Sequence, residues 1–193
     1  LRNYPQFNEI DTNYDDAYND FCDWLGDSKC VYLQGISGAS RADVESIESV
    51  LSIQELKGVV VGYVNEKRMQ LFEDKFGKEA LKERIYFTGR IKQLKTPQYI
   101  RKCIMGLVFY KNTTPNNWFC EPNRLFQIVN NGIPVVTGDN PPMKEFVEGG
   151  GFGISVSTDG SEVQKILEGI HYVLDNYDDI KLNIMNYSGS ALW

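Results

Sequence analysis

Residues 121–137 read EPNRLFQIVNNGIPVVT, which predicts a short helix followed directly by a buried strand. Pro122 suits the first position of a helix, Gly132 suits the residue just past its end, and Pro134 stands where the helix can no longer continue. The apolar run over 133–137 has the β-branched composition of a strand. A helix joined to an apolar strand in this way is the repeating unit of α/β proteins.

The same alternation runs through the chain. Further apolar runs of strand-like composition lie at 30–34, 59–64, 85–88, 106–110 and 153–156. Near-continuous apolar strands are buried on both faces, which is typical of a parallel sheet. Apolar residues at helical spacing lie between the runs and predict the crossover helices. We therefore expect an α/β fold of the Rossmann-like kind, a doubly wound, mostly parallel six-stranded sheet with helices on both faces.

Charge and cysteine content exclude several classes of protein. The 193-residue chain carries 20 Lys and Arg against 26 Asp and Glu, a formal net charge of −6. A field of this sign repels nucleic-acid phosphates, so no nucleic-acid partner is expected. No apolar run approaches the ~18 residues of a transmembrane segment. The four cysteines lack C-x-x-C spacing, so we expect reduced thiols in a cytoplasmic protein.

Two loops of the predicted sheet contain groups that suit phosphate. Ligands of open parallel sheets bind at the carboxyl ends of the strands. The loop after the first strand contains Gly35 and leads to Arg41, ahead of a helix N-terminus that attracts anions. Glu121, Asn123 and Arg124 crowd the first turn of the helix described above. The simpler alternatives are a tight turn with a solvated Arg41, and Glu121 complementing the helix dipole beside an exposed Arg124.

Several catalytic motifs are absent from the sequence. The dinucleotide fingerprint G-x-G-x-x-G and the phosphate loop G-x-x-x-x-G-K-[ST] do not occur, which disfavours NAD-dependent and ATP-hydrolysing functions. The one histidine, His171, falls in an amphipathic helix, where a structural or exposed position is expected. No D-x-D motif occurs either, so we expect a site without metal and a protein without a resident cofactor.

The stretch EPNRLFQIVNNGIPVV, followed by DNPPMKE at 139–145, resembles the donor-binding domain of retaining glycosyltransferases of the GT-B fold, the glycosyl transferases group 1 type. Members carry E-P-x-K/R-x-x-E and then G-x-P-V-V. VYLQG at 31–35 and IYFTGRI at 85–91 are similar in order to further segments of that domain. The resemblance covers nearly the whole chain. It implies an interdomain linker at 1–11, a nucleotide-sugar (donor) binding domain at 12–193, and an N-terminal acceptor domain absent from this chain.

The resemblance also implies roles for the matching residues. Arg41 and Arg124 would contact the donor diphosphate, and Glu121 would bind hydroxyls of the donor sugar or ribose, which makes Glu121 and Arg124 the catalytic candidates. The nucleotide base would meet the backbone around Gly89. The implied substrate-binding residues are Gly35, Arg41, Gly89, Arg90, Ile91, Glu121, Pro122, Asn123, Arg124, Leu125 and Gln127. The donor would be a nucleotide-diphosphate sugar.

Two positions depart from the family pattern and leave alternatives open. Gln127 stands where many members have a second Glu, and Phe119 stands where the longer acidic spacing would place the first. A non-catalytic nucleotide-sugar binding or partner module is therefore one alternative. A sugar-nucleotide 2-epimerase is another, since it shares the fold but uses additional acidic and histidine catalysts.

The resemblance further implies partners and a location. The partners would be the nucleotide-sugar donor, the protein's own N-terminal acceptor domain, and a lipid-linked or glycan acceptor in cell-surface polysaccharide synthesis. The location would be cytoplasmic, or peripheral at the inner face of the membrane through the N-terminal domain. The base, sugar, acceptor and linkage do not follow from the sequence.

Overall fold

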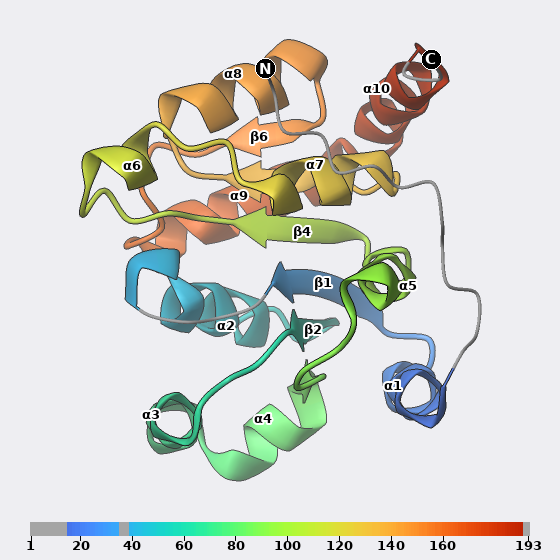
Figure 1. The fold of residues 1–193 in the computed structure, drawn as a ribbon, viewed down its shortest axis with the longest axis vertical. Coiled ribbons are helices and arrows are strands. Elements are labelled where there is room, and N and C mark those ends of the chain that lie inside the picture. Colours follow the sequence, from blue (N-terminus) through green and yellow to red (C-terminus); the bar gives the residue numbers. More distant parts are fainter. Residues whose placement is uncertain (1–14, 35–38, 191–193) are drawn as a thin grey trace.

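A six-stranded sheet of parallel strands forms the centre of the computed structural model, which describes residues 15–34 and 39–190. The predicted linker at 1–11 and Gly35 lie outside the described residues. The strand order is β3-β2-β1-β4-β5-β6 (Figure 1). The strands are β1 (Lys29–Gln34), β2 (Leu56–Val61), β3 (Ile85–Phe87), β4 (Met105–Val108), β5 (Val135–Thr137) and β6 (Gly153–Ser155). The predicted doubly wound α/β fold is thus confirmed.

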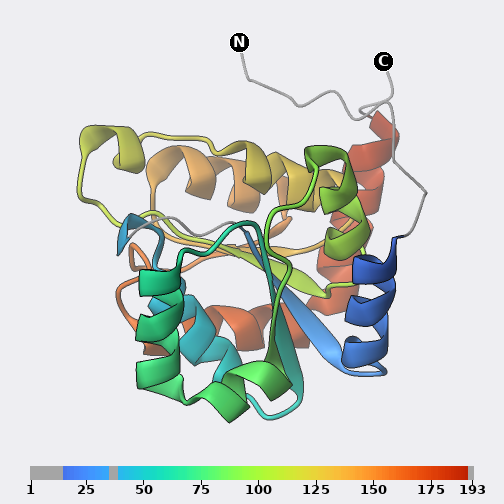
Figure 2. The same cartoon turned by 60° about the horizontal axis from the view of Figure 1, so that its bottom comes forward.

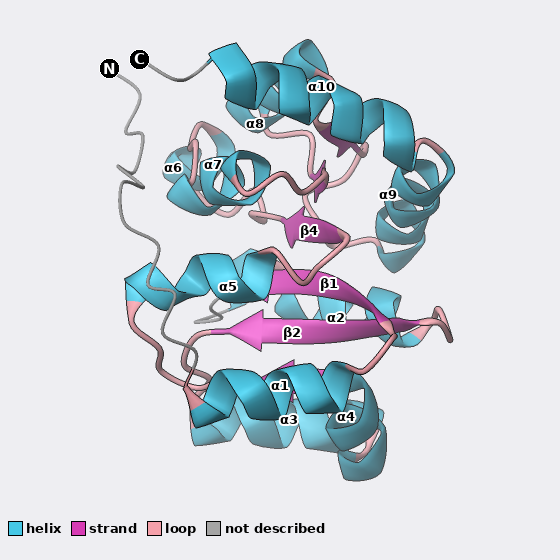
Figure 3. Ribbon diagram, turned by 90° about the vertical axis from the view of Figure 1, so that its right-hand side faces the viewer, coloured by secondary structure: helices cyan, strands magenta, loops and turns pink. Residues whose placement is uncertain are grey.

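Helices lie on both faces of this sheet (Figures 2 and 3). The α-helices are α1 (Asp16–Leu25), α2 (Asp43–Leu51), α3 (Glu66–Phe76), α4 (Lys78–Arg84), α5 (Thr96–Ile100), α6 (Pro115–Trp118), α7 (Asn123–Asn130), α8 (Pro141–Gly150), α9 (Val163–Asp175) and α10 (Tyr177–Ser190), with short 3₁₀ helices η1 (Ala39–Arg41) and η2 (Gln93–Lys95). Helices α2, α4 and α9 pack on one face, and α5, α7 and α8 pack on the other. This arrangement follows from right-handed crossovers that run in opposite directions from the centre of the sheet.

Some strands end at other residues than the sequence predicts. Pairing with the neighbouring strand and the local backbone angles decide these ends, rather than the apolar composition of the run. The run predicted at 59–64 is a strand over Leu56–Val61, because its first residue pairs with Lys29 at the start of β1. Gly62 then turns out of the strand with a φ of 128°. The run predicted at 106–110 ends at Val108, so Phe109 and Tyr110 begin the following loop.

Helix α7, the helix of the quoted stretch, lies directly on β4. Gly106 of β4 makes this approach possible, because a Cβ there would stand 2.6 Å from Cδ1 of Ile128. Gly132 has a φ of 81° just beyond the helix, as expected for the residue that ends it. Pro122 was predicted at the first helical position. Its extended ψ of 137° makes it the N-cap residue instead, so the helix begins at Asn123. The first turn of α7 is thereby fixed beside the end of β4.

Candidate functional site

The strand order reverses between β1 and β4, which are neighbours in the sheet. The chain leaves β1 toward β2 on one side and leaves β4 toward β5 on the other. The carboxyl ends of two such strands are the usual ligand position in open α/β sheets, and we call this edge of the sheet the crevice. Helix η1, the loop after β4 and the start of α7 meet at this edge.

Two arginines converge there on one tyrosine. Arg41, at the end of η1, donates a hydrogen bond of 2.6 Å from Nη1 to the hydroxyl of Tyr110. The guanidinium carbons of Arg41 and Arg124 lie 4.3 and 4.6 Å from the centroid of the Tyr110 ring. The structure therefore brings together the two basic residues that the sequence assigned to the donor diphosphate.

The two guanidiniums differ in their surroundings. Arg41 is half-buried and forms no ion pair with a described carboxylate. Arg124 is only 6% exposed, and its Nη2 donates to the carbonyl of Phe109 at 3.4 Å. Burial lowers the pKa of Arg124, and the positive charge of Arg41 lowers it further, while Tyr110 opposes both effects. A guanidinium nevertheless keeps its proton in proteins, so two like charges lie close together at this edge. An anion bound between them would relieve their repulsion.

The first turn of α7 adds backbone donors to the same edge. Its N-cap residue, Pro122, makes no side-chain cap hydrogen bond. The first N–H groups of a helix have no partner within the helix, and the helix dipole favours negative charge there. Arg124 lies within this first turn. A phosphate group beside Arg124 would therefore meet a guanidinium and a helix N-terminus together.

The loop between β4 and α7 is anchored at several points. The backbone N–H of Lys111 donates to the carbonyl of Ser40 at 2.8 Å, and its Nζ pairs with Glu45 at 2.5 Å. The buried Asn140, which precedes α8, donates from Nδ2 to the carbonyls of Asn117 at 2.8 Å and Tyr110 at 3.3 Å. These bonds hold the loop against η1, α2 and the end of β5.

The predicted base-binding segment lies farther along the same edge. Gly89 has a φ of 66° and forms an isolated bridge with Gly62. The guanidinium carbon of Arg90 lies 4.7 Å from the centroid of the Tyr63 ring, and both residues are exposed. Ile91, the third predicted residue, is half-buried. Because β3 is two strands from β1, this segment stands about 10 Å from the crevice.

The remaining predicted residues lie around the start of α7. Glu121 and Pro122 are half-buried, and Asn123 is exposed. Leu125 is fully buried in the core, so only its backbone can face a ligand. Gln127 is 3% exposed, and its Oε1 has no hydrogen-bond partner. Gln127 is thus a buried polar group with one unused acceptor.

Sequence reasoning missed two residues of this edge. Tyr110 is predicted at the end of a strand, and no role is predicted for Asn140. The signal that would have identified Tyr110 is its position, since a polar aromatic residue directly follows the apolar centre of a strand beside the crevice. Nothing in the sequence around Asn140 indicates its bonds to a loop more than 20 residues away.

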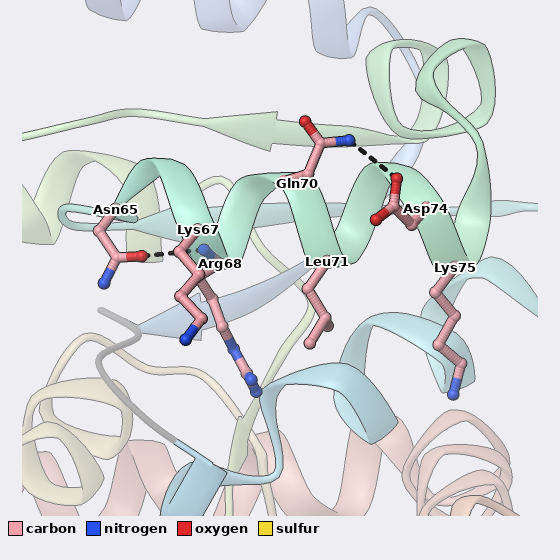
Figure 4. A pocket seen from close by; sticks show the side chains of 7 residues that line it. All are labelled: Asn65, Lys67, Arg68, Gln70, Leu71, Asp74 and Lys75. Atoms are coloured by element: carbon pink, nitrogen blue, oxygen red, sulfur yellow. Dashed lines mark hydrogen bonds between the residues drawn. The ribbon is translucent and has the colours of Figure 1, made fainter.

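A separate depression of about 710 Å³ lies along α3 (Figure 4). Its lining includes Arg68, Leu71 and Lys75, and it contains none of the residues described at the crevice. Arg68 is paired with Asp43, and Lys75 is paired with Glu48. Two of its basic groups are therefore already paired with carboxylates of α2, and the third is Lys67.

Within residues 15–34 and 39–190, no three His, Cys, Asp or Glu side chains are grouped as a metal site would need. No helix in this part of the chain combines the length and the apolar character of a membrane span. All four cysteines are free thiols, as expected.

Comparison with solved structures shows the same fold in nucleotide-sugar enzymes. HepE from Anabaena in complex with UDP-glucose superposes with a TM-score of 0.72 at 16% sequence identity, over 91% of this chain and 47% of HepE. WaaG, a glycosyltransferase of lipopolysaccharide biosynthesis, gives a TM-score of 0.68 at 14% identity, over 98% of this chain and 50% of WaaG. The chain thus has the fold of one half of a GT-B glycosyltransferase and spans about half the length of these proteins.

A second class of enzyme shares the fold. A UDP-N-acetylglucosamine 2-epimerase from Listeria monocytogenes gives a TM-score of 0.59 at 15% identity, over 90% of this chain and 42% of the epimerase. No family model and no curated protein sequence matches the chain. Likeness at these identities shows the fold, and the residues must decide the function.

Proposed function

We propose that this chain is the donor-binding domain of a glycosyltransferase that transfers a sugar from a nucleotide-diphosphate sugar to an acceptor. The observation that carries the proposal is the convergence of Arg41 and Arg124 on Tyr110 at the crevice between β1 and β4. HepE, which has the same fold, was solved with UDP-glucose and with UDP. The diphosphate of the donor would lie between the two guanidiniums.

The proposed mechanism follows from where charge develops. When the bond between the sugar and the diphosphate breaks, negative charge grows on the departing phosphate oxygens. Arg41, Arg124 and the uncapped first turn of α7 are positioned to stabilise that charge with little reorganisation. Interactions that strengthen as the charge grows lower the barrier more than those that bind the intact donor equally well. The positive charges of Arg41 and Arg124 would stabilise the negative charge that a bound divalent cation would otherwise stabilise, so the proposal includes no resident metal.

The rest of the donor would extend from this point in both directions. The base would lie about 10 Å away near Gly89 and Arg90, a span that suits a nucleoside extending past the end of β2. Glu121 would accept hydrogen bonds from hydroxyls of the donor. Gln127 has an unused acceptor and would serve a hydroxyl as a neutral group.

Several finer parts of the proposal concern the longer protein. Since the chain spans about half the length of HepE and WaaG, a second, N-terminal domain would bind the acceptor. The family that the sequence resembles transfers sugars with retention, often to lipid-linked or glycan acceptors of cell-surface polysaccharides. We propose the same for this protein: transfer with retention of configuration and an acceptor of that kind. We also propose a cytoplasmic location, either free or at the inner face of the membrane.

The 2-epimerase alternative finds less support in the residues. His171, the one histidine of the chain, is exposed on α9. It therefore does not lie beside the buried Arg124.

The alternative of a non-catalytic binding module makes the same prediction for nucleotide binding as the transferase and differs only in turnover.

Calorimetric titration of the chain with UDP, GDP and ADP tests the donor site. We expect one nucleotide to bind, and we expect Arg41→Ala and Arg124→Met to weaken its binding by about tenfold to a hundredfold, the contribution of a charge-assisted hydrogen bond. Arg101→Ala is the matched control, because Arg101 is an exposed arginine bonded to Asn131, which lies at the opposite end of α7 from its first turn.

Thermal unfolding of each variant separates lost binding from lost folding. Equal affinity in the wild type, Arg41→Ala and Arg124→Met would refute the proposed site. Turnover of the donor by the longer protein, compared with binding alone, then distinguishes the transferase from the non-catalytic module.

A further inference from the structure

We propose that Tyr110 is a positioning residue for the diphosphate, holding Arg41 and Arg124 in place and adding its own hydroxyl as a donor. The inference rests on the proposed function and deepens it. The sequence resemblance assigned no role to Tyr110. Its ring lies against the guanidiniums of both arginines.

The ring offsets the repulsion between the two guanidiniums. Like charges repel, and guanidinium carbons that lie 4.3 and 4.6 Å from one ring centroid are at most about 9 Å apart, close to the ~8 Å screening length of physiological salt. The face of an aromatic ring carries negative potential and attracts cations within about 6 Å of its centroid. Guanidinium carbons at 4.3 and 4.6 Å from one centroid are both within that range. Tyr110 therefore keeps two positive groups together in the absence of an anion.

The hydroxyl fixes one of the two arginines more closely. Arg41 Nη1 donates to the Tyr110 hydroxyl at 2.6 Å, so that oxygen acts as an acceptor. A phenol that accepts a hydrogen bond keeps its own proton for donation. A phosphate oxygen beside Arg41 could receive this proton in a hydrogen bond. The hydroxyl thus both orients Arg41 and offers a neutral donor to the ligand.

The backbone of Tyr110 is held as firmly as its side chain. Its carbonyl accepts from Asn140 Nδ2 at 3.3 Å, and the next N–H, of Lys111, donates to Ser40 at 2.8 Å. The residue is only 8% exposed. Because both its backbone and its hydroxyl are hydrogen-bonded, Tyr110 can hold the two neighbouring arginines in place. A preorganised phosphate site requires this.

The test compares UDP with uridine, which lacks the phosphates, on the 193-residue chain; if the chain binds GDP or ADP instead, that nucleotide and its nucleoside take their places. Tyr110→Phe keeps the ring and removes the hydroxyl, whereas Tyr110→Leu removes both. We expect UDP affinity to fall by about threefold to tenfold in Tyr110→Phe and by tenfold or more in Tyr110→Leu, with uridine affinity unchanged. We also expect the salt dependence of UDP binding to become shallower in Tyr110→Leu. Tyr86→Phe is the matched control, because its hydroxyl bonds to Ala17 away from the crevice.

The outcomes separate this inference from the function on which it rests. If the wild type binds none of UDP, GDP and ADP, the proposed function fails, and this inference fails with it. If the wild type binds UDP and both Tyr110 variants bind it equally well, the donor site stands and the role of Tyr110 is refuted. A parallel loss of UDP and uridine affinity would indicate a merely structural role. Should Tyr110→Leu not fold, Tyr110→Phe decides.

Discussion

Arg41 and Tyr110 lie 69 residues apart in the chain and are joined by a hydrogen bond of 2.6 Å from Nη1 to the phenol oxygen. The bond links the segment after β1 to the segment after β4, the two strands between which the sheet order reverses. With Arg124 on the same ring, the crevice has its positive groups in position before any ligand binds. Preorganisation of this kind reduces the entropy lost on binding.

Tyr32 provides a test of whether an unsatisfied group is tolerated near the site. Its hydroxyl is fully buried without a hydrogen-bond partner, and burial together with the Cys103 thiol raises its pKa. A buried polar group without a partner costs about 1–3 kcal/mol, so Tyr32→Phe should leave the free energy of unfolding unchanged or raise it by about 1 kcal/mol.

Urea unfolding of Tyr32→Phe beside Tyr18→Phe checks this expectation. The Tyr18 hydroxyl donates to the carbonyl of Gln98, so that variant should lose stability. A loss of more than about 1 kcal/mol in Tyr32→Phe would mean that its hydroxyl has a partner.

The sequence predicted the fold well because parallel strands have a local signature. Buried runs such as 30–33 and 105–108 are apolar over their length, and the helices between them have periodic apolar faces. Two-sided burial follows from composition without knowledge of the neighbours. The ends of the strands were predicted less exactly. Strand β2 begins at Leu56 because of its pairing with β1, and it ends at Val61 because Gly62 has a positive φ.

The site was predictable only in part. Arg41 and Arg124 could be predicted as site residues because each stands in a loop or helix terminus that favours anions. The ring that joins them was not, since the contact of Arg41 with Tyr110 depends on tertiary packing across the sheet. Asn140 was missed for the same reason, because its partners Tyr110 and Asn117 belong to another loop.

Asp43 and Arg68 form an ion pair that should stabilise the packing of α3 on α2. The Asp43 side chain is 1% exposed, and Arg68 contacts it through Nε at 2.6 Å and through Nη2. Removing one partner of a buried pair leaves an uncompensated charge, so Arg68→Ala should lower the free energy of unfolding by about 3 kcal/mol.

The matched control lies on the same helix. Lys75 pairs with Glu48 at the surface, with side chains 43% and 39% exposed, and Lys75→Ala should cost less than about 1 kcal/mol. Equal losses in chemical denaturation of the two variants would contradict the assignment of Asp43–Arg68 as a buried pair.

Asp159 should make the stability of the β4–α7 loop depend on pH. Burial opposes ionisation of Asp159, but hydrogen bonds from the N–H groups of Asn112 and Ser161 outweigh it, so its pKa lies below the usual 3.8. A carboxylate with a lowered folded-state pKa contributes stability above its unfolded pKa and loses that contribution as pH falls through the folded value.

Denaturation of Asp159→Asn and the wild type at two pH values checks the sign. We expect the wild type to be more stable at pH 7, and we expect the difference between the two proteins to shrink below pH 3.8. A difference that is equal at both pH values would contradict the expected role of the ionised Asp159.

Cys120 offers a chemical probe of the crevice. Its thiol is half-buried, and burial raises its pKa against the opposing charges of Arg124 and Arg41. Cys30 and Cys103 are buried, so native-state alkylation should be slow at both and faster at Cys120. UDP should slow the alkylation of Cys120 severalfold.

Cys22 is the internal control for that experiment. It is also half-buried, but it lies on α1, so its alkylation rate should not respond to the nucleotide. Peptide mass spectrometry measures both sites in one sample. Equal protection of Cys22 and Cys120 would indicate a global effect of UDP rather than occupancy of the crevice.

A crystal structure of the chain with UDP tests the central claim most directly. The account predicts diphosphate oxygens within about 2.7–3.2 Å of guanidinium nitrogens of both Arg41 and Arg124, with the base near the backbone of Gly89. Nucleotide bound elsewhere, for example in the depression along α3, or a diphosphate in contact with neither arginine, would contradict it.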